Sequence, residues 1–170
     1  YIVEKSAFPN SVVEAPTAIP AFIGITEKAV NGADTLSGKP WKITSMTEFQ
    51  QYFGGAPAPE FRLSVVDYPE KDASKTFYGI PSPDKSKLLR VEAPEVTFSL
   101  YYQMVMFFAN GGGTCYIVSA GTYDQKSLID KEKVVAALTA LKKEQEITMV
   151  LVPEAVSVDE CKDIQTQVLA

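Results

Sequence analysis

The sequence predicts an α/β domain in which a partly parallel sheet is flanked by helices, with an extended N-terminal arm and a β-rich, proline-containing insertion. Three observations predict this class. Continuous apolar runs at 17–25, 115–119 and 148–152 are typical of strands buried on both faces. Stretches with the apolar spacing of helices alternate with the later runs, as parallel strands joined by crossovers require. The 170 residues, 46% of them hydrophobic, suffice for one core.

Residues 1–16 are predicted to form an extended arm. Strand-prone and polar side chains alternate along it, Pro9 and Asn10 interrupt the pattern, and it has no second apolar face. The buried strand predicted at 17–25 follows directly. We therefore expect the folded domain to begin at residue 17 and to include everything up to residue 170.

A short strand predicted at 42–44 leads into the first helix. Ser45 and Glu48 have the spacing of a capping box, in which the serine oxygen accepts a hydrogen bond from a backbone N–H of the first turn. The helix is expected to end at Gly54 and Gly55, because glycine readily adopts the backbone conformations that close helices.

Residues 56–95 differ in character from the rest of the chain. They contain six of the eleven prolines, interleaved with short strand-prone runs at 61–68, 75–80 and 87–93. Proline lacks the N–H that a central strand donates, so it is found on edge strands and in turns. We interpret this segment as a β insertion at the surface.

The second half of the chain alternates helices and strands. A helix predicted at 98–109 is apolar on nearly all sides, so we expect it to be covered by protein on most sides. A strand at 115–119, an amphipathic helix at 128–144 and a core strand follow. Ser157 and Glu160 are predicted to form a second capping box, which starts the last helix.

Composition limits the chemistry that this chain can perform. It has no histidine, which excludes Ser–His and Cys–His catalysis within it and removes the commonest metal ligand. Its two cysteines are too few for a disulfide scaffold and lack a CxxC spacing. The formal charge of −5 argues against binding to nucleic acid or anionic lipid through the overall field. No apolar run reaches the roughly 18 residues of a membrane span. We predict no catalytic, cofactor-binding or metal-ligating residue and no membrane insertion.

Two glycine-rich segments are candidate phosphate loops, and a cysteine is a candidate nucleophile. The glycines at 111–113 follow a helix instead of preceding one, so a helix C-cap and tight turn is the preferred interpretation. The segment 32–39 has five residues between its glycines, and Pro40 replaces the serine or threonine that would hold magnesium, which favours a flexible turn. Cys115 lies in a predicted strand and is interpreted as a small buried hydrophobe.

Two side-chain clusters have similarly simple interpretations. Carboxylates of the insertion lie among lysines, which is typical of a solvated surface with mixed charge; they are Asp67, Glu70, Asp72 and Asp84. Aromatic residues of the helix at 98–109 have helical spacing, which favours core packing or a protein interface over a platform for stacking bases; they are Tyr101, Tyr102, Phe107 and Phe108.

Three stretches follow one another in the order VEKSAFPNSVVEAPTAIPAFIG, WKITSMTEFQQYFGG and VTFSLYYQMVMFFANGGGTCYIVSAG. In this order they resemble the N-terminal half of the contractile tail sheath family of phages and phage-like injection systems, and the arm is most similar to sheaths of extracellular systems. The resemblance covers most of the chain except 56–95. The residues that carry it in the second and third stretches are Thr44, Ser45, Glu48, Phe49, Phe53, Gly54, Phe108, Asn110, Gly111, Gly112, Cys115, Tyr116 and Val118.

The resemblance implies a structural subunit, not an enzyme, which polymerises into a helical tube around an inner tube and contracts to drive it through a target envelope. The implied partners are other copies of the chain, the inner tube protein, and baseplate and terminator proteins, with no cofactor. Synthesis in the bacterial cytoplasm and incorporation into a phage tail or a released phage-tail-like particle are expected. Residues 17–170 would then be an incomplete sheath domain within a longer polypeptide, with a C-terminal domain beyond residue 170.

The arm has an expected role in such a polymer. Its unpaired N–H and C=O groups can add a strand to the sheet edge of a neighbouring subunit, and a contact of this heterologous kind builds an open helix. Its predicted pairing positions are Ile2, Val3, Val12 and Val13. Two alternatives stay open: an α/β enzyme domain with its catalytic residues beyond residue 170, and an adhesin-like or baseplate protein that binds through the β insertion.

Overall fold

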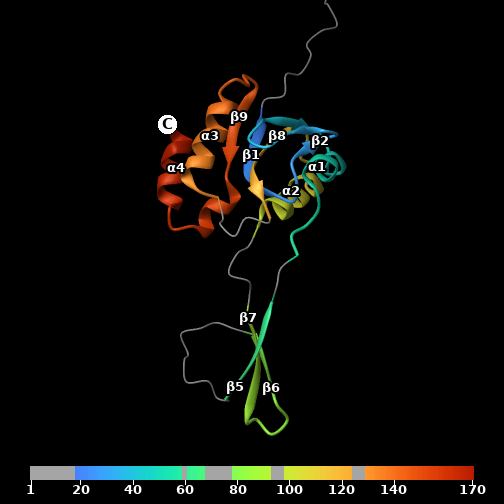
Figure 1. Cartoon of the computed structure of the whole chain (residues 1–170), viewed down its shortest axis with the longest axis vertical. Helices are drawn as coiled ribbons and strands as arrows, with labels where there is room; N and C mark the ends of the chain where they lie inside the picture. Colours follow the sequence, from blue (N-terminus) through green and yellow to red (C-terminus); the bar gives the residue numbers. More distant parts are fainter. Residues whose placement is uncertain (1–17, 59–60, 68–77, 93–97, 124–128) are drawn as a thin grey trace, which may run out of the picture.

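The computed structural model describes residues 18–58, 61–67, 78–92, 98–123 and 129–170. Figure 1 shows two parts, an α/β body (18–58, 98–123 and 129–170) and a smaller β module (61–67 and 78–92). The predicted arm lies outside the described residues. The elements are β1 (Ile19–Thr26), β2 (Val30–Asn31), β3 (Asp34–Thr35), β4 (Trp41–Ile43), α1 (Met46–Phe53), β5 (Arg62–Asp67), β6 (Tyr78–Pro81), β7 (Lys87–Glu92), α2 (Leu100–Ala109), β8 (Cys115–Thr122), α3 (Lys131–Leu141), β9 (Ile147–Leu151), the 3₁₀ helix η1 (Pro153–Ser157) and α4 (Cys161–Leu169).

The body is built on a four-stranded sheet in the order β4-β8-β1-β9. Strand β1 runs parallel to both β8 and β9, whereas β4 is antiparallel to β8, with Trp41 opposite Ile117. Strand β1 is buried at every residue, which explains why its sequence is a continuous apolar run without alternation. The predicted class, an α/β fold with a partly parallel sheet, is confirmed.

Helices cover both faces of this sheet and create two clusters of buried side chains. On one face α1 and α2 pack through Phe49, Phe53 and Met104 against Ile117 of β8. On the other face α3 and α4 pack through Val134 and Ile164 against β1 and β8. Figure 1 shows the two helical layers on opposite sides of the strands. The sheet therefore lies between two layers of helices.

Two helix starts in the body use side-chain caps. At α1 the Ser45 Oγ accepts a hydrogen bond from the Glu48 N–H at 3.2 Å, which confirms the predicted cap. The Glu48 carboxylate accepts from the backbone N–H of Thr44, one residue before its expected partner. At α3 the cap is Asp130, whose carboxylate accepts from the Lys133 N–H at 2.8 Å. Helix α3 therefore begins three residues later than predicted, and residue 128 lies outside the described residues.

The second predicted capping box is wrong. Ser157 is the last residue of η1, and Glu160 is the N-cap of α4 without a side-chain cap hydrogen bond. The Glu160 carboxylate instead accepts from the backbone N–H of Lys131, at the start of α3, at 3.3 Å. The five residues Pro153–Ser157 form a 3₁₀ helix of their own, so Ser157 ends that helix and does not cap α4.

The described part of the chain covers helix α2 on one side only, so the cover expected on its other sides is not found among the described residues. Leu100 and Met104 are fully buried against the sheet and α1, but Tyr102, Val105 and Met106 are exposed, Met106 to 61%. One layer of helices suffices to cover each face of the sheet, and no described element packs over the outer side of α2. An apolar helix surface is therefore left open.

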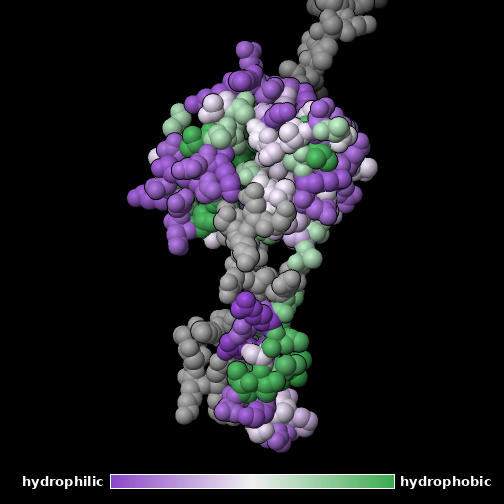
Figure 2. All heavy atoms as spheres, in the orientation of Figure 1, coloured by the Kyte–Doolittle hydropathy of each residue, from purple (hydrophilic) through white to green (hydrophobic). Residues whose placement is uncertain are grey.

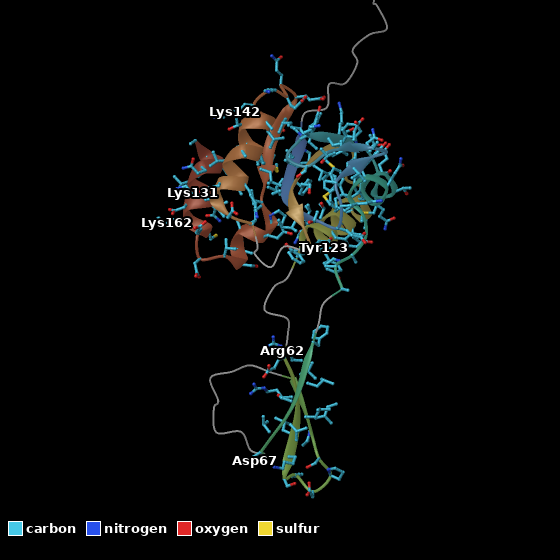
Figure 3. All side chains as sticks on the ribbon, in the orientation of Figure 1. Arg62, Asp67, Tyr123, Lys131, Lys142 and Lys162 are labelled. Carbon is cyan, nitrogen blue, oxygen red and sulfur yellow. The ribbon has the colours of Figure 1, made fainter. Side chains whose placement is uncertain are left out.

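The β module is a three-stranded antiparallel sheet in the order β5-β7-β6. Its register runs from Arg62 opposite Glu92 to Asp67 opposite Lys87. Figure 1 shows it projecting away from the body, and Figure 3 shows Arg62 and Asp67 at the two ends of β5. The prediction of strands within the 56–95 insertion is confirmed, and these strands form a sheet separate from that of the body.

Candidate assembly interface

The candidate interface for strand addition is the free edge of β9. In the described part of the chain, β9 pairs only with β1, and it is the last strand of the sheet. The pairing starts with a register shift at Ile19, whose N–H donates to the Thr148 side chain at 3.1 Å. The outer N–H and C=O groups of a sheet edge are available to another strand.

An apolar groove lies beside this edge. It has a cavity volume of about 330 Å³ and is formed by α3, β9 and the C-terminal end of α4. Lys142, at the C-terminal end of α3 in Figure 3, and Glu144 are at its rim. The apolar side chains that line it include Val135, Leu138, Leu141, Ile147, Val150 and Val168. The groove can hold an apolar side chain of a strand that pairs with β9.

A polar cluster positions the start of β9 against the rest of the sheet. The Glu146 carboxylate forms a salt bridge with Lys42 of β4 at 2.7 Å and accepts a hydrogen bond from the hydroxyl of Tyr116 of β8. The hydrogen bond with Lys42 holds the pKa of Glu146 below its usual range. Burial and the neighbouring glutamate raise the pKa of Tyr116, so its hydroxyl stays protonated and donates. The cluster links β4, β8 and the start of β9, so we assign it a structural role.

A buried carboxylate that the sequence analysis missed links η1 to strand β1 and to the start of helix α2. Glu154, in η1, is fully buried, and its two oxygens accept backbone hydrogen bonds from Ile25 at 2.9 Å and from Ser99 and Leu100 at 3.1 Å each. Ser99 and Leu100 begin α2, where the helix dipole favours a negative charge. The Ile25 N–H follows the shift in register between β1 and β8 after Gly24, and Glu154 satisfies it.

The surroundings of Glu154 indicate a structural role. Burial raises its pKa, and the three N–H donors oppose that shift. A Cβ atom at Gly24 would lie 2.6 Å from the Glu154 carboxylate, so only glycine leaves room for this contact. The donors are backbone groups that the carboxylate satisfies, and no second titratable side chain shares the site with a hydrogen bond among the described residues. No local pattern in the sequence marks Glu154, because its partners lie far away in the chain.

Tyr123, at the end of β8, lies where the β module leaves the body. Its hydroxyl donates to the Gly55 carbonyl at 3.0 Å, and its ring stacks on Phe98 with 4.9 Å between ring centres. Gly55 and Phe98 belong to the two segments that connect the body to the module (Figure 3 labels Tyr123). Tyr123 thus holds the two connections to the same point of the sheet.

The remaining candidate residues have the simple roles that the sequence favoured. Cys115 is fully buried, and burial raises the pKa of its thiol to about 12, so it is not a reactive thiolate. Gly111 has a φ of +84° and follows α2, which confirms the C-cap and turn. In segment 32–39, Gly32 is in the turn between β2 and β3, and a second turn follows β3, where the Gly38 N–H donates to the Ser119 carbonyl of β8 at 2.9 Å. The predicted flexible turn is thus two turns on either side of a short strand.

The acidic residues of the insertion form local surface contacts where they are described. Asp67 pairs with Lys87 at 2.5 Å. The Asp84 carboxylate accepts hydrogen bonds from Ser82 and Ser86, which lower its pKa to about 2. Glu70 and Asp72 lie outside the described residues. Within the described ranges there is no group of three or more acidic, cysteine or histidine residues that could hold a metal ion.

The four predicted pairing positions of the arm, Ile2, Val3, Val12 and Val13, all lie outside the described residues. In the part of the chain that the structure describes, no helix has the length and apolarity that crossing a membrane requires. Comparison of the chain with protein-family models gave no match, and comparison with curated protein sequences gave none either.

Proposed function

We propose that this chain is a structural subunit of a contractile tail sheath, which polymerises into a helical tube around an inner tube and contracts to drive that tube through a target envelope. The order of the three family-like stretches in the sequence supports this proposal. The structural observation on which it mainly rests is the free edge of β9 beside an apolar groove.

The arm of a neighbouring copy is the proposed partner of this edge. Backbone groups of the arm would continue the β9 ladder, and because side chains of a strand alternate between its two sides, one residue of each adjacent pair would face the groove. For the pair Ile2 and Val3, and likewise for Val12 and Val13, one side chain enters the groove and the other lies on the opposite side of the sheet. Uncharged apolar residues suit the lining of Leu138, Ile147 and their neighbours.

This exchange of arms would join subunits into an open chain and would not produce a closed dimer. The arm and the β9 edge are different surfaces, so the contact is heterologous and its repetition generates an open helix. During contraction, bodies would rotate and repack as rigid units while the arms keep the lattice connected. The free energy would come from better contacts between subunits in the contracted state, with no nucleotide bound by this chain. The inner tube, baseplate and terminator proteins are the proposed further partners.

Assembly of the protein on its own tests this proposal. The protein is expressed alone in a bacterium, together with a variant that lacks residues 1–15, and both are examined by negative-stain electron microscopy and sedimentation. We expect long hollow tubes with regular cross-striations from the parent, and folded subunits that form no stable tubes from the deletion variant. Tubes formed normally without the arm would rule out arm exchange. Discrete monomers of the parent with a saturable small ligand would favour the enzyme or adhesin alternatives instead.

A further inference from the structure

We propose that the open face of the β module in one copy of the chain docks onto an exposed stripe of helix α2 in a second copy. The open face is defined by Leu63, Val65, Ile80 and Leu89, and the α2 stripe by Tyr102, Val105, Met106 and Ala109. The inference rests on the proposed assembly of copies of this chain into a polymer, and it adds to arm exchange a second contact between subunits.

The open face is a continuous apolar surface. Val65 is directly opposite Leu89, and Leu89 is directly opposite Ile80, so these three side chains lie on the same side of the sheet. Leu63 lies two residues before Val65 on the same side. Val65 and Ile80 are each 67% exposed. Figure 2 shows apolar residues gathered on one side of the module.

The opposite side of this sheet has a different character. Arg90 and Glu92 form an ion pair there, and Leu88 is buried against Gly79, where a Cβ atom would lie within 3 Å of the leucine. Asp67 and Lys87, by contrast, lie on the side of the open face, where they pair with each other beyond Val65 and Leu89. A three-stranded sheet is stable when an apolar face packs on something, so the open face indicates a missing layer.

The α2 stripe is the matching helical feature. Its residues follow the i, i+3, i+4, i+7 spacing of one helix face, and all four are exposed. Helix α2 contains no charged residue. Its inner side is occupied by Leu100 and Met104, so the stripe is the side that faces away from the sheet of the body. The body thus has a helix face without a sheet, and the module has a sheet face without a helix.

Size and charge make the two surfaces suitable partners. Three strands span about 10 Å between the outer strand axes, and six residues extend about 20 Å. The ten residues of α2 make a rod about 15 Å long and about 10 Å across. The helix therefore fits within the open face. The residues that define the two surfaces are uncharged, and the charges of Asp67 and Lys87 at the end of the open face pair with each other, so docking buries no unpaired charge.

Because the open face and the α2 stripe are different surfaces, the contact between them would be heterologous. Docking of two open faces on each other would give a closed, two-fold symmetric dimer. Such a dimer does not fit a tube in which all subunits point in the same direction along the axis. Docking of the open face on the α2 stripe is heterologous and can repeat without limit. The footprint, about 10 by 15 Å, is far below the roughly 800 Å² per partner of a stable isolated interface. The contact is thus weak between free subunits and becomes occupied when arms hold copies at high effective concentration.

Cysteine cross-linking in the full-length protein tests this contact. Val65→Cys and Met106→Cys are introduced together in a Cys161→Ser background, which leaves Cys115, fully buried, as the one native cysteine within residues 1–170. Both substituted positions are more than half exposed, so the fold should tolerate the changes. Under assembly conditions, a short bismaleimide should produce a ladder of covalent oligomers. Mixing the two single variants should give heterodimers, and neither single variant alone should give dimers.

A matched control replaces Met106→Cys by Val156→Cys, an apolar residue of η1 that is 75% exposed and lies outside both surfaces. This control should give no ladder. Tubes without the ladder, a cross-link only within one chain, or dimers of the Val65→Cys variant alone would each overturn the inference while leaving the sheath proposal intact. A ladder in concentrated protein that forms no tubes would support the docking and reject the sheath. Absence of both tubes and ladder would reject both.

Discussion

The body and the β module differ in how far they bury the apolar residues of their strands. Strand β1 of the body is covered on both faces, and all eight of its residues are buried. Strand β5 of the module alternates, and its apolar residues Leu63 and Val65 are about two-thirds exposed. The helices of the body therefore cover both faces of its sheet, whereas one face of the module's sheet is left without a covering layer. We infer that stability resides in the body and that the module contributes a surface.

The largest loss of stability is expected when the buried carboxylate of the body, Glu154, is removed. Glu154→Ala leaves the N–H groups of Ile25, Ser99 and Leu100 without partners in a buried site. An unsatisfied buried donor costs about 1–3 kcal/mol, so we expect a loss of about 3 kcal/mol or more in the free energy of unfolding. Urea unfolding followed by circular dichroism measures it.

Gly24→Ala should cause a loss of similar size, because the new Cβ would lie 2.6 Å from the same carboxylate. The control is Glu144→Ala, which removes a carboxylate from the rim of the groove. Unchanged unfolding of both the Glu154 and Gly24 variants would show that this contact does not hold the body together.

A matched pair of truncations compares the two regions directly. Ile117→Ala removes a fully buried side chain of the body and should cost about 2–4 kcal/mol, as large-to-small core changes do. Val65→Ala removes an exposed side chain of the module and should change the unfolding free energy of the isolated chain by at most about 0.5 kcal/mol. Equal losses in unassembled protein would mean that the open face is already covered within one chain.

The pH dependence of stability isolates the buried carboxylate. The pKa of Glu154 is raised in the folded state, mainly by burial. The folded protein therefore holds this proton to higher pH than the unfolded chain does, and stability from this group is complete below the unfolded pKa and is lost as pH rises through the folded value. Glu146 and Asp84, whose pKa values are lowered, act in the opposite direction at lower pH.

The difference between the parent and Glu154→Gln separates these contributions. We expect the parent to lose stability relative to the glutamine variant as pH rises above about 4.3, the ordinary value for glutamate, and the difference to become constant once the carboxylate is ionised. Thermal melts at intervals of half a pH unit measure this difference. A difference that does not change with pH would contradict the raised pKa.

The sequence predicted the elements whose signals are local. Strand β1 and helix α1 were predicted because their signals, a continuous apolar run and the Ser45 cap, each involve residues that are close together in the sequence. The Ser157 cap was wrong because the same spacing occurs within a chain segment that first forms a 3₁₀ turn. Glu154 was missed because its partner N–H groups are 54 to 129 residues away in the chain.

The cover of helix α2 is a feature that local signals do not specify. An apolar helix must be covered, but periodicity does not tell whether the cover comes from the same chain or from another. Within the described part of this chain, Met106 has no such cover. The predicted pairing positions of the arm, which lie outside the described residues, would depend in the same way on a partner. Local signals thus sufficed for the elements of the body, whereas the cover of α2 depends on contacts that are not local in the sequence.

The smallest expected effect concerns the ion pair at the far end of the module. Lys87 and Asp67 lie 2.5 Å apart, and both side chains are largely exposed. The hydrogen bond from Lys87, together with its charge, lowers the pKa of Asp67, but water and salt screen such surface pairs. Asp67→Asn should therefore leave the Tm unchanged within error at neutral pH, at both low and high salt, with Lys87→Met as its control. A clear fall in Tm at low salt that disappears at high salt would show that charge at the surface, and not the missing layer on the open face, limits the stability of the module.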